Sequence, residues 1–201
     1  MTSLKAEAFI PRSPRAELLH TCALTDLTEL ARVGFRGADS AAYLEERGYR
    51  LPSQPNQALR QDDGSWVARL SATEYLLLGS VADQGARVAA EEQTWVQDTR
   101  RNYLLPRQDS HAWLQLSGEH CSAVMAKLCG VDLRLQAFAV GAVTQTSAAR
   151  INVIVVNVGS DELPALQLLF DRASLAYFQE AVLDAMDEFD GGWVALDQLM
   201  R

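Results

Sequence analysis

The chain has 201 residues, with 18 Lys and Arg against 26 Asp and Glu, so its formal net charge is −8. Hydrophobic residues make up 48% and charged residues 22%, a balance that excludes intrinsic disorder because disordered chains are far less hydrophobic. The acidic composition also argues against a nucleic-acid-binding protein, which would carry a basic patch or stripe.

Residues 1–26 open the chain without clear hydrophobic periodicity. Pro11 and Pro14 restrict their neighbours to extended conformations. We therefore predict an N-terminal arm over residues 1–26. The arm either docks on a partner or forms a disordered terminus.

A first compact unit is expected over residues 27–93, beginning with a strand at 27–35. Gly34 and Gly37 bracket a turn, and the helix that follows is capped by Asp39 or Ser40. Gly48 is a good terminator for this helix.

The second half of this unit reads as a hairpin, a strand and a helix. Asp62-Asp63-Gly64 predicts a hairpin turn, and Trp66, Ala68 and Leu70 alternate so that they share one face of its second strand. We expect a buried strand at 75–78 and a short helix at 85–93.

A second unit, residues 111–201, repeats this plan. A strand at 112–116 and a Ser117-Gly118 turn precede a helix at 119–129. Further strands are expected at 143–149, 151–158 and 166–170, before a last helix at 172–189. The predicted buried stripes of the two helices have helical spacing: Cys121, Val124, Met125 and Leu128 in the first, and Leu175, Phe178, Val182, Met186 and Phe189 in the second.

The pattern as a whole predicts an α+β fold made of two small pseudo-repeated modules with antiparallel or mixed sheets and packed helices. We expect residues 27–201 to form a single domain, with the modules joined by residues 94–110. Three arginines in this join, Arg100, Arg101 and Arg107, flank the apolar residues 103–106. The join is therefore either a docking patch or a solvated connector.

Residues suited to metal binding or nucleophilic catalysis are poorly spaced. Cys121 and Cys129 lie two helical turns apart, and no paired CxxC motif is present. His120 could pair with Cys121, but a core cysteine beside a surface histidine is the stronger interpretation. His20 and His111 are isolated; for His111 we expect a structural hydrogen bond rather than a role as catalytic base.

Motifs for nucleotide binding and serine hydrolysis, such as GxGxxG and GxSxG, are absent. Five carboxylates near the C-terminus fall opposite the apolar stripe and predict a solvated helix face. They are Glu180, Asp184, Asp187, Glu188 and Asp190. The tryptophans at 66, 95, 113 and 193 could form a stacking platform, but core packing is expected for those on strands. We predict no catalytic, cofactor-binding or metal-binding residue on this chain.

Several segments, taken in order, carry a resemblance to a known family. They are Arg32-Val33-Gly34-Phe35-Arg36-Gly37, Pro55-Asn56, Val67-Ala68-Arg69-Leu70, Glu74 to Leu78, Ser110-His111-Ala112-Trp113, Leu116-Ser117-Gly118, Lys127-Leu128-Cys129 with Val131-Asp132-Leu133, Gly141 to Thr146, Ala176-Tyr177-Phe178, and Asp184-Ala185 before Glu188-Phe189. This order and spacing, over residues 27–189, resembles the gamma subunit of heterotetrameric sarcosine oxidase. The chain departs at Phe138-Ala139, where the family often has Phe-Pro, and at Asp190, where it often has Gly.

The resemblance implies a non-catalytic subunit with a fold similar to the folate-binding modules of the glycine-cleavage T-protein. Its complex would demethylate sarcosine with oxygen and tetrahydrofolate, giving glycine, methylenetetrahydrofolate and hydrogen peroxide. The partners implied are the alpha, beta and delta subunits, which carry FAD, FMN, NAD, tetrahydrofolate and zinc. The alternative is a free-standing, folate-binding protein of the T-protein type.

The sequence also suggests a compartment. No run approaches about 18 apolar residues, so we expect no transmembrane helix and no membrane partner. Residues 1–15 lack the apolar region of a signal peptide. Only three cysteines are present, Cys22, Cys121 and Cys129, which is typical of a reducing compartment and predicts a cytoplasmic protein.

Overall fold

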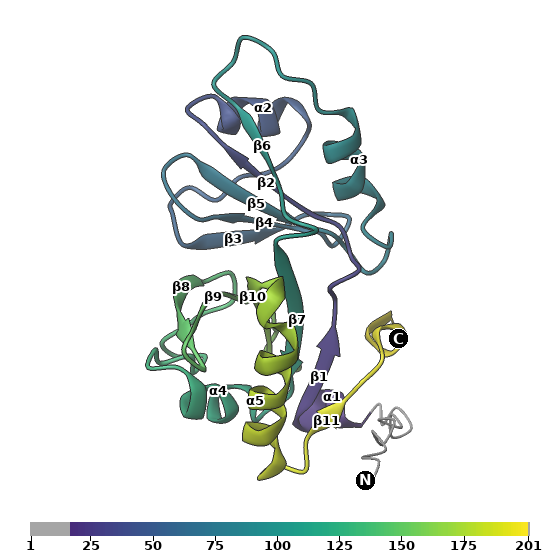
Figure 1. The fold of residues 1–201 in the computed structure, drawn as a ribbon, viewed down its shortest axis with the longest axis vertical. Coiled ribbons are helices and arrows are strands. Elements are labelled where there is room, and N and C mark those ends of the chain that lie inside the picture. Colours follow the sequence, from purple (N-terminus) through teal and green to yellow (C-terminus); the bar gives the residue numbers. More distant parts are fainter. Residues whose placement is uncertain (1–16, 201) are drawn as a thin grey trace, which may run out of the picture.

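A computed structural model describes residues 17–200 and places two β-sheets face to face, with helices on their outer sides (Figure 1). The larger sheet has six strands in the order β11-β1-β7-β10-β9-β8. Its strands are β11 (Gly192–Trp193), β1 (Ala23–Asp26), β7 (His111–Ser117), β10 (Ala165–Asp171), β9 (Ile151–Asn157) and β8 (Val143–Ala148). Neighbours are antiparallel except for β1 and β11, which are parallel.

The smaller sheet has five antiparallel strands in the order β3-β4-β5-β2-β6. They are β3 (Gln57–Arg60), β4 (Trp66–Arg69), β5 (Glu74–Leu78), β2 (Arg32–Arg36) and β6 (Tyr103–Pro106). The predicted hairpin is confirmed as β3 and β4, and Gly64 in its turn has a φ of 86°. Trp66, Ala68 and Leu70 all lie in one core, as the alternation predicts.

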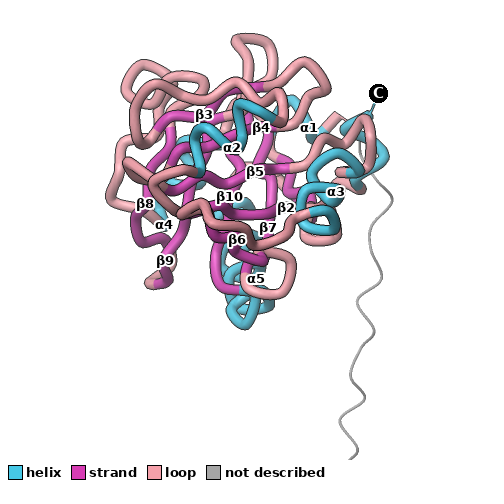
Figure 2. Tube along the Cα trace, turned by 90° about the horizontal axis from the view of Figure 1, so that it is seen from above, coloured by secondary structure: helices cyan, strands magenta, loops and turns pink. Residues whose placement is uncertain are grey.

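Four helices cover the outer faces of the sheets: α2 (Ser40–Glu46) and α3 (Ala86–Thr94) on the smaller sheet, and α4 (Cys121–Leu128) and α5 (Leu175–Asp187) on the larger one. Helix α1 (Leu18–Thr21) packs beside Ala23 on the opposite face of the larger sheet, and short 3-10 helices lie at Arg172–Ser174 and Leu196–Met200. Figure 2 shows α2 crossing over the strands of the smaller sheet. Of the stripe predicted for α5, Phe178, Val182 and Met186 are fully buried in the core on the outer face of the larger sheet, while Leu175 and Phe189 are partly buried and pack against it. Within residues 17–200, no helix is long and apolar enough to cross a membrane.

A separate core fills the space between the two sheets. Trp113, Val156 and Leu169 enter it from the larger sheet, and Trp66 and Leu76 from the smaller. Because both sheets bury apolar side chains in this layer, the modules are packed as one unit.

The two modules share one topology, which confirms the predicted doubled α+β plan. Each runs strand, helix, three strands, helix, and the spatial order β3-β4-β5-β2 in the first matches β8-β9-β10-β7 in the second. Each four-stranded module gains a fifth strand that lies outside it in the sequence, and the two modules exchange these strands. Strand β6 precedes the second module in sequence but completes the sheet of the first, whereas β1 precedes the first module and pairs with β7 of the second.

The exchange corrects two predicted boundaries. The predicted arm over residues 1–26 differs from the structure at 17–26, which form α1 and β1; residues 1–16 lie outside the described part. Cys22, Ala23 and Leu24 are completely buried, so this segment belongs to the larger sheet and its cores. The join at 94–110 contains β6 and is thus part of the smaller sheet.

Candidate functional site

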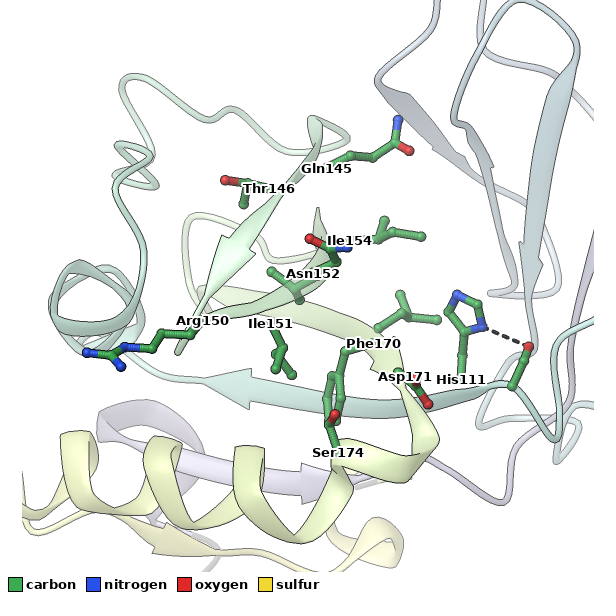
Figure 3. Close-up of a pocket in the computed structure, with 13 residues that line it drawn as sticks. His111, Gln145, Thr146, Arg150, Ile151, Asn152, Ile154, Phe170, Asp171 and Ser174 are labelled. Atoms are coloured by element: carbon green, nitrogen blue, oxygen red, sulfur yellow. Dashed lines mark hydrogen bonds between the residues drawn. The ribbon is translucent and has the colours of Figure 1, made fainter.

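A groove of about 930 Å3 lies on the inner face of the larger sheet. Figure 3 shows it as a shelf formed by β7, β8, β9 and β10. Its lining residues come from these strands and their ends: Ser110, His111, Gln145, Thr146, Arg150, Ile151, Asn152, Val153, Ile154, Leu169, Phe170, Asp171 and Ser174.

The strand register explains why polar groups gather there. Leu169 pairs with Trp113, and both enter the inter-sheet core. Two residues further along the same face, Asp171 pairs with His111. Side chains two apart on a strand point to the same side, so this second row continues the inner face beyond the core. The groove is therefore the part of that face which carries a polar row.

His111 and Ser110 are hydrogen-bonded within the groove, with 2.8 Å between Ser110 Oγ and His111 Nδ1. Burial lowers the pKa of His111 to about 4, and the nearby charges of Arg107 and Arg32 act in the same direction. The imidazole is therefore neutral at pH 7 and a weak base. The structural hydrogen bond predicted for His111 is confirmed.

The other groove residues do not complete a catalytic arrangement around His111. Asp171 accepts a hydrogen bond from the Ala173 amide at 2.9 Å, and this contact caps the turn that leads into α5. Ser110 Oγ also donates to the main-chain oxygen of Pro106 at 3.2 Å. Arg150 extends away from His111 at the far end of the groove (Figure 3). A mixed polar and apolar groove of this kind suits recognition of another surface better than proton transfer.

The cysteines and the other histidines lie elsewhere. Burial raises the pKa of Cys22 to about 11 and raises that of Cys121 as well, so both thiols stay protonated. His120 stacks on Phe189 with ring centroids 4.5 Å apart, while His20 is exposed. Among residues 17–200, no group of three metal-binding side chains comes together.

The acidic residues and the tryptophans have the expected structural roles. All five carboxylates at 180–190 are exposed, which confirms a solvated helix face. Trp66 and Trp113 lie in the inter-sheet core, as predicted for tryptophans on strands. Trp95 and Trp193 pack against the other two main cores, so the four do not form a platform.

The arginines of the join have acidic partners within the chain. Arg100 forms ion pairs with Asp98 and Glu46, each at 2.8 Å. Arg101 pairs with Asp39 at 3.3 Å, and Arg107 with Glu74 at 2.9 Å. The predicted basic rim is thus largely neutralised, although Tyr103 beside it is 52% exposed.

One buried residue was not anticipated from the sequence. Arg32, at the start of β2, is only 1% exposed and donates to the main-chain oxygens of Thr28, Leu30, Gln108 and His111. Burial lowers its pKa to about 10, and Arg172 contributes in the same direction. These contacts join the segment before β2 to the segment before β7. The sequence gives no signal for this role, because an arginine near a strand end is ordinarily solvated.

A second cavity, of about 800 Å3, opens at the other end of the inter-sheet layer. Gln115 and Gln167 line it and are only 9% and 7% exposed. The side-chain oxygen of Gln167 has no hydrogen-bond partner within residues 17–200. A buried acceptor without a partner is unusual and marks this cavity as a candidate ligand site.

Comparison with known proteins finds solved structures that share this architecture. No family model matches the chain. A solved heterotetrameric sarcosine oxidase from Corynebacterium sp. U-96, in complex with pyrrole 2-carboxylate, contains a chain with a TM-score of 0.67 and 22% identity, over 85% of this chain and 86% of that one. Aminomethyltransferase T of the glycine cleavage system from Bartonella henselae gives a TM-score of 0.64 at 14% identity, over 89% of this chain and 49% of that one. The chain therefore has a T-protein-like α+β fold.

Within this fold class, two curated relatives are more specific. Both are named sarcosine oxidase subunit gamma. The one from Corynebacterium sp. (strain P-1) is 29% identical over 174 residues, which cover 84% of this chain and 82% of the relative. The one from Arthrobacter sp. is 26% identical over 176 residues, covering 86% and 83%. The resemblance to sarcosine oxidase gamma subunits is confirmed.

Proposed function

We propose that this chain is the gamma subunit of a heterotetrameric sarcosine oxidase and that it serves the complex without an active site of its own. The observation that carries this proposal is the match to two sarcosine oxidase gamma subunits over more than four fifths of their length. The reaction proposed for the complex is demethylation of sarcosine with oxygen and tetrahydrofolate.

The chemistry of the described residues supports a structural role. The buried thiols are protonated, and the groove histidine is neutral and hydrogen-bonded to its neighbour. The partners proposed are the alpha, beta and delta subunits. FAD, FMN, NAD, tetrahydrofolate and zinc are proposed to reside on those partners, and this chain then braces the assembly.

Co-expression with the three other subunits from the same genome tests the proposal. A tag on this chain should recover a yellow complex that forms hydrogen peroxide from sarcosine. The matched control expresses the three partners without this chain, and we expect a loss of soluble complex there. Recovery of this chain alone and colourless would refute the assignment.

The second cavity favours one alternative, a free-standing folate-binding protein. Its lining combines two buried glutamines with apolar side chains such as Trp66 and Val158, and a few polar groups among apolar ones are typical of a site that orients a ligand. Calorimetric titration of the purified chain with tetrahydrofolate separates the two functions. Micromolar binding that Gln167→Leu abolishes would favour the alternative, whereas no binding would favour the subunit.

A further inference from the structure

Strand β6 has an uncovered edge, unlike edge strands β3 and β8 of the described residues. The edge of strand β3 that faces away from β4 is hydrogen-bonded to the segment before β8, because the Ala58 amide donates to the Gly141 oxygen at 2.7 Å. Strand β8 is bonded at both ends, where the Val143 amide donates to Asn56 and Ala148 forms a bridge with Cys129. Strand β11 is only two residues long. No main-chain hydrogen bond reaches β6 from a strand other than β2 within residues 17–200.

The pseudo-repeat indicates what is missing at this edge. Strand β1 holds the place in the larger sheet that β6 holds in the smaller one, since each lies beside the first strand of a module. The far edge of β1 is covered by β11, which pairs through Gly192 and Trp193. In the part of the chain that the structure describes, the smaller sheet ends at β6 and has no counterpart of β11.

The register identifies the groups that β6 offers to a neighbour. Leu105 pairs with Gly34, and Leu104 with Phe35. Pro106 has no N–H, so the bonded pairs of this antiparallel ladder are those of Tyr103 and Leu105. The N–H and C=O of Leu104 therefore point away from β2, toward the uncovered side.

The surroundings of this edge are apolar and nearly neutral. Tyr103, on this edge, is 52% exposed. The arginines on either side already pair with carboxylates of the chain. Native proteins normally protect an edge strand with charge, proline, a bulge or a cover, because an open edge recruits other strands. Pro106 protects one end of β6, while the main-chain groups of Leu104 have no partner strand among residues 17–200.

We propose that β6 accepts an uncharged, extended segment of a partner subunit, which adds a sixth strand to the smaller sheet. This inference rests on the proposed function, since it takes its occupant from that complex. The added strand would use the main-chain groups of Leu104 for hydrogen bonds and cover Tyr103 with apolar side chains. A charged segment would find no unpaired arginine in the join to match it.

A pair of substitutions at Leu104 tests the proposal in the co-expressed complex. Leu104→Pro removes the outward N–H and leaves the bonded pairs with β2 intact, whereas Leu104→Ala keeps the N–H and removes the same packing. We expect Leu104→Pro to lower the amount of co-purified partner at least tenfold, and Leu104→Ala to retain most of it. Equal recovery with both variants would overturn the proposal.

A second pair of substitutions tests the same edge without introducing a proline, so that the result does not depend on the folding of Leu104→Pro. Tyr103→Lys places a charge at the edge, and Leu135→Lys places one at another exposed apolar position that is 42% exposed. Only Tyr103→Lys should reduce partner recovery. If the unaltered chain recovers no partner, the proposed function itself fails, and the inference falls with it. If the isolated chain forms a dimer and Leu104→Pro makes it monomeric, the occupant of the β6 edge is instead a second copy of this chain.

Discussion

Arg32 and His111 are the first residues of the strands that open the two modules, and the Arg32 guanidinium donates a hydrogen bond to the main-chain oxygen of His111. The contact lies where the segments leading into β2 and β7 meet. Gln108 adds to it by donating to the Thr28 oxygen at 3.1 Å. The buried guanidinium of Arg32 thus stabilises the place where the chain passes between the two modules.

Replacing Arg32 should strongly destabilise the fold. Arg32→Met removes one hydrogen-bond donor from each of four main-chain oxygens. The oxygens of Thr28 and Gln108 keep a second donor, whereas the other two lose this one, and we expect a loss of about 3 kcal/mol in the free energy of unfolding. Urea denaturation measures this loss. The control is Arg36→Met, whose side chain is 66% exposed in the original chain and whose loss should change stability by less than about 0.5 kcal/mol. Similar losses in both variants would contradict the role assigned to Arg32.

His111 should make stability depend on pH. Its pKa is about 4 in the folded protein against 6.5 for the unperturbed group, so the unfolded chain binds more protons between these values. The contribution of His111 is complete above pH 6.5 and is lost as the pH falls toward 4. Urea denaturation at pH 7 and pH 5 should show a larger loss on acidification for the original chain than for His111→Gln. Parallel behaviour of the two proteins would contradict this prediction.

Gly118 should be intolerant of any side chain. Its φ is 107°, and a Cβ atom there would lie 2.4 Å from the main-chain oxygen of Thr21. We expect Gly118→Ala to lower stability by more than about 2 kcal/mol. Gly130→Ala is the matched control, because a Cβ atom meets nothing within 4 Å at that position. Thermal denaturation of the two variants provides the comparison.

Trp113 should stabilise both sheets at once. It is fully buried in the inter-sheet core, so Trp113→Ala should cost about 3 to 5 kcal/mol. Hydrogen exchange should accelerate in β5 of the smaller sheet as well as in β10 of the larger one. Acceleration confined to the larger sheet would show that the modules unfold independently.

Local patterns predicted the elements that local forces determine. The Asp-Asp-Gly turn and the alternation of Trp66, Ala68 and Leu70 were sufficient for the β3–β4 hairpin, and the helical spacing of Phe178, Val182 and Met186 for α5. Strand β1 was missed because it has four residues and pairs with β7, far along the chain. The proximity of His111 and Asp171 likewise depends on a register that no local pattern encodes.

The strand exchange also has a consequence for synthesis on the ribosome. Strand β1 is made first, but its partner β7 begins only at residue 111, after the whole of the smaller sheet has been translated. The smaller sheet can close as soon as β6 emerges, while Ala23 and Leu24 still lack their neighbours. Until β7 has left the ribosomal exit tunnel, the nascent chain therefore displays β1 as an unpaired apolar strand that chaperones can bind.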